Sequence, residues 1–187
     1  MSVIARQGNL VEEPDATFIV NASNTELVLG SGVSAAFRAH CGDDEYQQYL
    51  HTCKTAYERE HGPIQQGDVV CTGAGTARNI RNVLHGAVMD YSSGKSSMPT
   101  IHTVEKILEG IGECISRMRP SLPSDLTRIK LVLPLMGTGV GGLDKRSVLE
   151  SYARHLIPMA RELDMDIVVY GYSRDDFFLI RAALKGA

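Results

Sequence analysis

The sequence predicts an α/β protein in which helices cover both faces of a mixed central sheet. Short apolar segments typical of strands alternate with stretches whose apolar residues recur at helical spacing, and no linker or internal repeat interrupts this alternation. A chain of 187 residues is long enough to bury a substantial core. We therefore expect one domain, residues 1–187, that needs neither a metal ion nor a disulfide for its stability.

The first half of the chain is predicted to contain four strands and two helices. The strands are expected at residues 3–7, 16–21, 67–72 and 80–88, and the helices at residues 33–41 and 43–60. A His-Gly-Pro sequence at 61–63 ends the second helix, because glycine and proline interrupt helices. The turn-rich residues 73–76 separate the third strand from the fourth.

The second half is predicted to contain three helices and two strands. Helices are expected at about 99–118, 145–163 and 175–184, and strands from Leu131 onward and at 166–170. Residues 92–97 form a loop, and two prolines at 119–123 end the helix before them. Ser173 is the expected N-cap of the last helix, with Asp176 three residues later in the pattern of a capping box.

Two glycine-rich loops indicate function. Leu29-Gly30-Ser31-Gly32-Val33 precedes the first helix, and Gly137-Thr138-Gly139-Val140-Gly141-Gly142 lies ahead of the helix at 145–163. Their bare backbone amides, together with the positive end of a helix dipole, suit a phosphate or diphosphate. Glycines after strands are also ordinary turn residues, so the presence of two such loops is what favours an anion site. Both loops follow strands, where ligands of such sheets bind.

Charge and hydropathy exclude several classes of protein. The formal net charge is −3 and no basic stripe is present, so electrostatics do not favour binding to duplex nucleic acid. The apolar stretches are much shorter than a transmembrane helix, and the N-terminus lacks the apolar core of a signal peptide. We expect a cytoplasmic or nuclear protein that binds no membrane and requires no cofactor.

Cysteines and histidines give no metal signature. The four cysteines form no CxxC pair, which argues against a structural zinc site and against a disulfide framework. Three histidines and two cysteines of the expected helices lie near one another: His40, His51, His61, Cys41 and Cys53. Their spacing matches no standard metal-ligand pattern. His85 lies in an apolar strand, and we interpret it as a hydrogen-bonded core histidine rather than a catalytic base.

Four motifs resemble the signature of the macro domain family, in the family's order. Val20-Asn21-Ala22-Ser23-Asn24, followed by the first glycine loop, resembles V-N-A-A-N and its G-G-G-V loop. Residues 67–72 resemble the G-E-A-V-x-T strand, residues 84–88 the I-H-A-V strand, and residues 134–142 the P-x-x-x-T-G-x-x-G loop. The motifs cover nearly the whole chain. The resemblance implies a three-layer αβα sandwich that binds ADP-ribose in a cleft on its crest.

The resemblance also implies which residues contact the ligand. They are Asn9, Leu10, Asn24, Gly30, Ser31, Gly32, Val33, Gly137, Thr138, Gly139, Val140, Gly141 and Tyr172. The two glycine loops would wrap the diphosphate, and Asn24 would contact the distal ribose. Tyr172 would pack against adenine, although an aromatic residue after a strand is also a common structural feature. Asn21 is interpreted as a structural residue that ties the strand end to the first loop.

Three residues depart from the family pattern. Asn9 replaces an aspartate that accepts a hydrogen bond from the adenine amino group, and a neutral amide makes a weaker bond than a carboxylate. Ser34 replaces the aspartate of the best-known hydrolases of the family, and a serine is no base without a partner. Gly141 replaces an aromatic residue beside the distal ribose, which we expect to leave that end of the site more open.

Two classes of function follow. The first is a module that binds ADP-ribose or a derivative, free or protein-linked. The alternative is a hydrolase that removes ADP-ribose from acidic side chains, or acetyl or phosphate groups from modified ADP-ribose, by means of a phosphate-bound water. The absence of a positioned acid or base favours binding, and no catalytic residue is identified. A less favoured hypothesis is binding of other ADP-containing or poly(A)-like ligands, because the weaker adenine contact of Asn9 would permit them.

Overall fold

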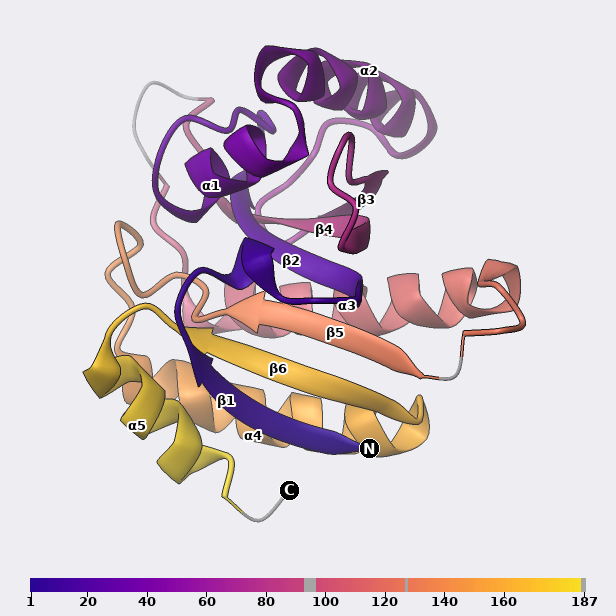
Figure 1. Cartoon of the computed structure of the whole chain (residues 1–187). Helices are drawn as coiled ribbons and strands as arrows, with labels where there is room; N and C mark the ends of the chain where they lie inside the picture. The colour runs from indigo at the N-terminus through magenta and orange to yellow at the C-terminus, as the bar shows by residue number, and fades with distance from the viewer. Residues whose placement is uncertain (93–96, 127, 186–187) are drawn as a thin grey trace.

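The computed structural model describes residues 1–92, 97–126 and 128–185 of the chain. The elements are β1 (Ser2–Gln7), η1 (Leu10–Glu12), β2 (Ala16–Asn24), α1 (Gly32–Cys41), α2 (Asp43–His61), β3 (Val69–Gly73), β4 (Ile80–Met89), α3 (Ile101–Met118), η2 (Arg119–Ser121), β5 (Ile129–Pro134), α4 (Lys145–Glu162), β6 (Met165–Gly171) and α5 (Arg174–Ala183) (Figure 1). All expected strands and helices are present. The loop expected at 92–97 lies largely outside the described residues.

The six strands form one mixed sheet in the order β1-β6-β5-β2-β4-β3. Neighbouring strands are parallel except for β3 and β4, which are antiparallel. The carboxyl ends of the five parallel strands therefore meet at one edge of the sheet. In Figure 1 these ends point to the left, where the segments that follow β1, β2, β5 and β6 come together.

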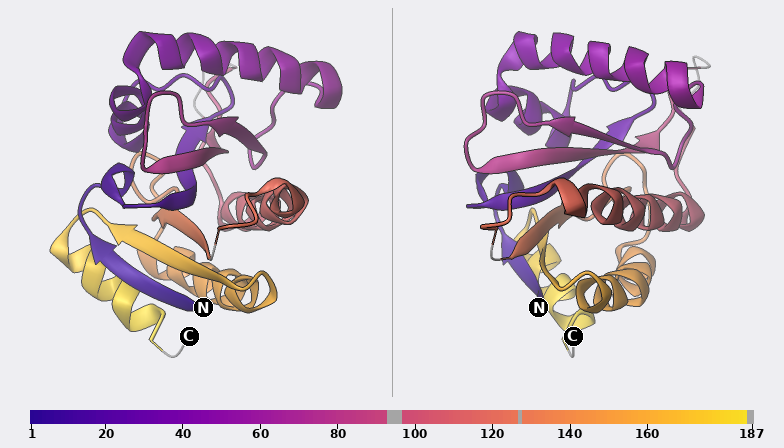
Figure 2. Two further views of the ribbon diagram at one scale, coloured as in Figure 1. Left: turned by 45° about the vertical axis from the view of Figure 1, so that its right-hand side comes forward. Right: turned by 90° about the vertical axis from the view of Figure 1, so that its right-hand side faces the viewer.

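Helices cover both faces of the sheet, so the predicted three-layer sandwich is confirmed (Figure 2). Successive side chains of a strand point to opposite faces. Accordingly, Phe18 packs in the cluster that contains α3, α4 and α5, whereas Ile19 packs in the cluster that contains η1, α1 and α2. Both residues are fully buried. The central strands are nearly continuous apolar runs because both of their faces are covered.

The N-termini of α5 and α3 can be compared with the sequence predictions. Ser173 is the N-cap of α5 and forms a capping box with Asp176, which confirms that prediction. The expected start of α3 at Pro99 is wrong, because α3 begins at Ile101. The Thr100 side chain caps it by accepting a hydrogen bond from the backbone N–H of Thr103, and the Thr103 side chain accepts from the Thr100 N–H.

Two local features differ from the sequence expectation. The third strand begins at Val69 rather than at residue 67, because the backbone N–H of Asp68 donates to the carbonyl of Gln65 in a preceding turn. The short helix η1 was not expected. No helix in the described part of the chain has both the length and the apolar composition required to span a membrane.

Candidate anion-binding site

The two glycine loops lie at the same edge of the sheet, because each follows a strand of the parallel group. The first loop connects β2 to α1 and the second connects β5 to α4, and both lie on the left in Figure 1. The pairing of β1 with β6 in register Gln7 with Gly171 brings Asn9 and Tyr172 to this edge as well. The backbone N–H of Gly8 donates to the Gly171 carbonyl over 3.2 Å. All sequence-predicted site residues therefore belong to one end of the molecule.

The first loop opens directly onto the uncapped N-terminus of α1. Ser31 is the N-cap residue, but its side chain makes no capping hydrogen bond. The first N–H groups of a helix have no partner within the helix, so those of α1 remain available as donors. A Cβ atom added at Gly30 or Gly32 would meet no atom within 4 Å. An anion can therefore approach this backbone closely and meet the positive end of the α1 dipole.

The second loop is a closed turn that leaves its central amides exposed. The N–H of Gly142 donates to the carbonyl of Gly139 over 3.0 Å, and that of Leu143 donates to the carbonyl of Gly137 over 2.9 Å. Within the described residues, no acceptor faces the N–H groups of Gly139 and Val140. The Gly139 Cβ position is open, as it is at Gly30. The backbone of this loop therefore leaves two amides without a partner in the described part of the chain, beside open space.

The N-terminus of the helix that follows the second loop is not open to an anion, contrary to the expectation from the sequence. Asp144 caps α4, and its carboxylate accepts hydrogen bonds from the Ser147 backbone N–H over 2.9 Å and hydroxyl over 3.0 Å. These bonds lower the pKa of Asp144 and favour its ionised form. A carboxylate already occupies the positive end of this helix, so only the loop amides remain for a ligand. The signal was in the sequence, because aspartate directly before a helix is a preferred N-cap.

The expected opening beside Gly141 is also wrong. Gly141 is buried, and a Cβ atom there would lie 2.6 Å from the Gly137 carbonyl oxygen and 2.7 Å from a ring carbon of Pro99. Pro99, in the segment before α3, therefore fills the space that the absent side chain would have taken. This contact joins residues that are distant in the sequence, and no local pattern predicts it.

A buried chain of polar side chains begins beneath the first loop at Ser34. The Ser34 hydroxyl donates to Asn21 Oδ1 over 3.0 Å and lies 3.2 Å from the Ala22 carbonyl oxygen. Asn21, fully buried in β2, places its Nδ2 3.1 Å from His85 Nδ1. Asn21 is a buried structural residue, but its amide ties the strand to the first turn of α1 rather than to the loop itself. The Ser34 hydroxyl therefore points toward the buried hydrogen-bonded side chains of Asn21 and His85.

The hydrogen bonds of His85 determine which of its ring nitrogens carries the proton. Because Asn21 Nδ2 is a donor, His85 Nδ1 accepts, and the ring proton lies on Nε2. Nε2 then donates to Thr72 Oγ1 over 3.0 Å, and the Thr72 hydroxyl donates to the Gly73 carbonyl. Burial lowers the pKa of His85 to about 3. The interpretation as a hydrogen-bonded core histidine is confirmed. A ring with so low a pKa is too weak a base to take up a proton near pH 7, and its acceptor nitrogen is already used by Asn21.

Asn24 organises the first loop with most of its hydrogen-bonding capacity. Its Oδ1 accepts from the backbone N–H groups of Glu26 and Val28 over 3.1 and 3.3 Å, and its Nδ2 donates to the Val28 carbonyl over 2.9 Å. A primary amide has two N–H groups, so one donor remains for a ligand. Asn24 therefore mainly stabilises the loop, and it has one N–H group left to donate to a ligand.

The residues expected at the adenine end differ in what they can offer. Asn9 is exposed and caps η1, with its Oδ1 3.4 Å from the Val11 backbone nitrogen. The Leu10 side chain is buried in the core, so only its backbone can meet a ligand. Tyr172 is 93% exposed. It makes an aromatic surface available close to the connection between β1 and η1, since the neighbouring Gly171 accepts a hydrogen bond from the Gly8 N–H.

Sequence reasoning missed the support beneath η1. Glu13 is fully buried, and its carboxylate accepts hydrogen bonds from Arg6 over 2.8 Å, Lys130 over 3.0 Å and Tyr170 over 2.7 Å. Burial and the neighbouring Glu13 raise the pKa of Tyr170 to about 12. Asn79, from the segment before β4, adds two hydrogen bonds from its Nδ2 to the carbonyls of Val11 and Glu13. Except for Arg6, these partners are distant from η1 in the sequence, so no local signal reveals them.

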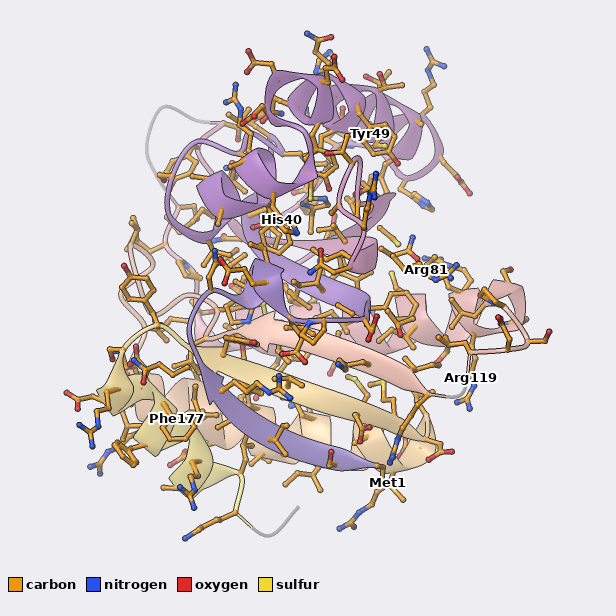
Figure 3. The ribbon with its side chains drawn as sticks, in the orientation of Figure 1. Met1, His40, Tyr49, Arg81, Arg119 and Phe177 are labelled. Atoms are coloured by element: carbon orange, nitrogen blue, oxygen red, sulfur yellow. The ribbon has the colours of Figure 1, made fainter. Side chains whose placement is uncertain are left out.

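Other surface features lie away from the loops. One hollow of about 240 Å³ borders Arg119 and Arg128, and one of about 740 Å³ lies between α3 and α4; neither borders a glycine loop. The labelled Arg81 and Arg119 are on the right of Figure 3, opposite the loops. Among the described residues, no three His, Cys, Asp or Glu side chains are grouped to hold a metal ion.

Comparisons with known proteins agree with the resemblance. Residues 20–152 match the family model of the Macro domain. An uncharacterized protein of Pyrobaculum aerophilum is 27% identical over 184 residues, which cover 96% of this chain and 90% of the relative. The Oceanobacillus iheyensis macrodomain with ADP gives a TM-score of 0.76 at 18% identity, covering 97% of this chain and 88% of that chain. The Trypanosoma brucei macrodomain in complex with ADP-ribose gives a TM-score of 0.71 at 19% identity, and the match covers 96% of this chain and 68% of that chain. At these identities the structural matches establish the fold alone.

Proposed function

Because the chain belongs to the Macro domain family, we propose that it binds ADP-ribose or a derivative, free or protein-linked, through the backbone amides of its two glycine loops. The observation that carries this proposal is the uncapped N-terminus of α1 behind an open Gly30 and Gly32. The solved macrodomains with ADP and with ADP-ribose support the same class of ligand. The diphosphate is the anchor, because helix and loop amides favour anions without a basic side chain.

The order of the residues along this edge of the sheet indicates how the rest of the ligand is oriented. The adenine end lies over η1, next to Asn9 and Tyr172, and the distal ribose lies near the remaining donor of Asn24. Calorimetry with ADP-ribose, ADP, AMP and ribose 5-phosphate tests the proposal. We expect ADP-ribose and ADP to bind much more tightly than AMP. Equal affinities for AMP and ADP would contradict a diphosphate anchor.

Tyr172 is expected to contribute by stacking rather than by its hydroxyl. The side chain is 93% exposed in the free protein, so it loses little by rearranging over a base. We expect Tyr172→Ala to weaken ADP-ribose binding about fivefold, the equivalent of roughly 1 kcal/mol for an aromatic contact, and Tyr172→Phe to be nearly neutral. Isothermal titration of both variants measures this. A Tyr172→Phe variant as weak as Tyr172→Ala would show that the hydroxyl carries the contact.

We favour binding over hydrolysis because of the environment of Ser34. Its hydroxyl is buried and donates to Asn21, so it supplies no base to a water beside the ligand. We expect release of ADP-ribose from a peptide carrying ADP-ribosyl-glutamate to be slow or absent in a single-turnover time course with excess protein. Rapid release that persists in Ser34→Ala but is lost in Asn24→Ala would favour the alternative, attack by a phosphate-bound water. Rapid release that is lost in Ser34→Ala would make Ser34 a participant.

A further inference from the structure

The segment that leads into the first glycine loop contains a strained residue. Leu27 has a φ of 51°, in the left-handed region that bulky side chains rarely adopt, and its side chain is buried with Ile64, Val70 and Ala87. Such a conformation persists only where the surrounding structure holds it in place. The contacts that hold Leu27 therefore determine where the backbone of the next residues, including Gly30, is placed.

Gln47 of α2 holds this segment by two hydrogen bonds. Its Nε2 donates to the Leu27 carbonyl over 2.9 Å, and its Oε1 accepts from the Leu29 backbone N–H over 2.8 Å. The side-chain amide thus pairs with the loop backbone as a neighbouring strand would. Leu29 immediately precedes Gly30, so the second bond fixes the last peptide before the open amides. In Figure 3 the labelled Tyr49 marks this part of α2.

Among the described residues, the other hydrogen bonds to the loop from outside it lie at its beginning, while the buried Leu29 side chain packs at its far end. Asn24 binds the backbone of Glu26 and Val28, and the Thr25 backbone N–H and hydroxyl bind the Met89 carbonyl and the Asp90 carboxylate. These bonds fix where the loop leaves β2. Gln47 fixes its far end, next to α1, and does so from a helix that carries no proposed ligand contact.

We propose that Gln47 is a positioning residue for anion binding, which it supports by fixing the first glycine loop in its binding conformation before the ligand arrives. The inference rests on the proposed function, because the ligand of the loop is the diphosphate of ADP-ribose. A loop that is ordered during folding does not have to be ordered at the expense of binding free energy. Loss of the clamp should therefore weaken ligands that use the loop amides and spare ligands that do not.

Two substitutions test the clamp. Gln47→Ala removes the amide, and Gln47→Met keeps nearly the same length while removing both hydrogen bonds. We expect each to raise the Kd of ADP-ribose about tenfold and to leave the weak binding of adenosine, followed by NMR titration, unchanged. Gln48→Ala is the matched control, because Gln48 is the exposed neighbour on the same helix. A parallel loss of adenosine and ADP-ribose binding would overturn the proposal in favour of general destabilisation.

Gln47→Glu adds a second measurement, the pH dependence of ADP-ribose affinity, which a purely structural role of Gln47 would not change. The ionised carboxylate can still accept from the Leu29 N–H but cannot donate to the Leu27 carbonyl, whereas the protonated acid can do both. We expect the affinity of this variant, relative to wild type at the same pH, to recover as the pH falls from 7 toward about 4.5, near the ordinary pKa of glutamate. A ratio that does not change with pH would count against the clamp.

The outcomes separate this inference from the function on which it rests. If wild type binds ADP-ribose and the Gln47 variants bind equally well, the positioning role fails and the proposed function stands. If wild type itself shows no binding of ADP-ribose, the proposed function fails and the positioning role falls with it. Thermal unfolding of each variant accompanies the titrations, and Gln47→Glu at low pH provides the test if Gln47→Ala does not fold.

Discussion

Gly30→Leu and Gly139→Leu are each expected to weaken ADP-ribose binding by about 100-fold while leaving the fold intact. Neither glycine has a positive φ, and a Cβ atom at either position would meet no atom within 4 Å, so the free protein accommodates a side chain. Leucine would fill the space over the amides that the diphosphate needs. Two lost hydrogen bonds to a charged group correspond to roughly 3 kcal/mol, which is about 100-fold in Kd.

The choice of positions matters for this experiment. Gly32 has a φ of 56°, so a substitution there strains the backbone and confuses loss of binding with loss of structure. Ala182→Leu, at an exposed position of α5, is the control for adding an apolar side chain to the surface. Wild-type affinity in both folded glycine variants, measured by calorimetry, would refute the assignment of the two loops.

His85 is expected to make the protein sensitive to acid well above the pH at which carboxylates titrate. Its pKa is about 3 in the folded protein and about 6.5 in an unfolded chain. Below pH 6.5 the unfolded state therefore binds a proton that the folded state does not, and the free energy of unfolding falls by roughly 1.4 kcal/mol per pH unit. Between pH 7 and pH 5 the loss from this one residue is about 2 kcal/mol.

His85→Gln isolates this effect. Glutamine can accept from Asn21 and donate to Thr72 without titrating. We expect urea unfolding to show a much smaller loss of stability from pH 7 to pH 5 in this variant than in wild type, with exposed His51→Gln behaving like wild type. The carboxylates with lowered pKa values, Asp90, Asp144 and Asp176, are common to all three proteins. The same pH dependence in wild type and His85→Gln would show that another group is responsible.

The sequence predicted features that depend on short stretches of chain. The alternation of strands and helices, the Ser173 cap and the burial of His85 follow from apolar periodicity and from the preferences of single residues. The glycine loops were recognised for the same reason. The Asp144 cap belongs to this group and was missed, although its position directly before α4 was a sufficient signal.

The sequence did not reveal how the site is supported. Residues from β1, β5 and β6 converge on Glu13, and Pro99 fills the space beside Gly141. Apart from the Arg6–Glu13 pair, each of these contacts joins segments that are far apart in the chain. Their identity depends on which strands become neighbours, and the strand order β1-β6-β5-β2-β4-β3 does not follow the order of the sequence.

The sequence by itself determined the fold class and the two glycine loops to which we assign the anion, because periodicity and glycine content act locally. The tertiary structure decided which loop amides remain available and what holds them in place. The first loop keeps an open helix N-terminus, whereas the second lies beside a helix already capped by Asp144. Gln47 reaches the first loop from α2 because two helices pack on one face of the sheet. Hydrogen bonds between distant segments exist only once packing has brought those segments together.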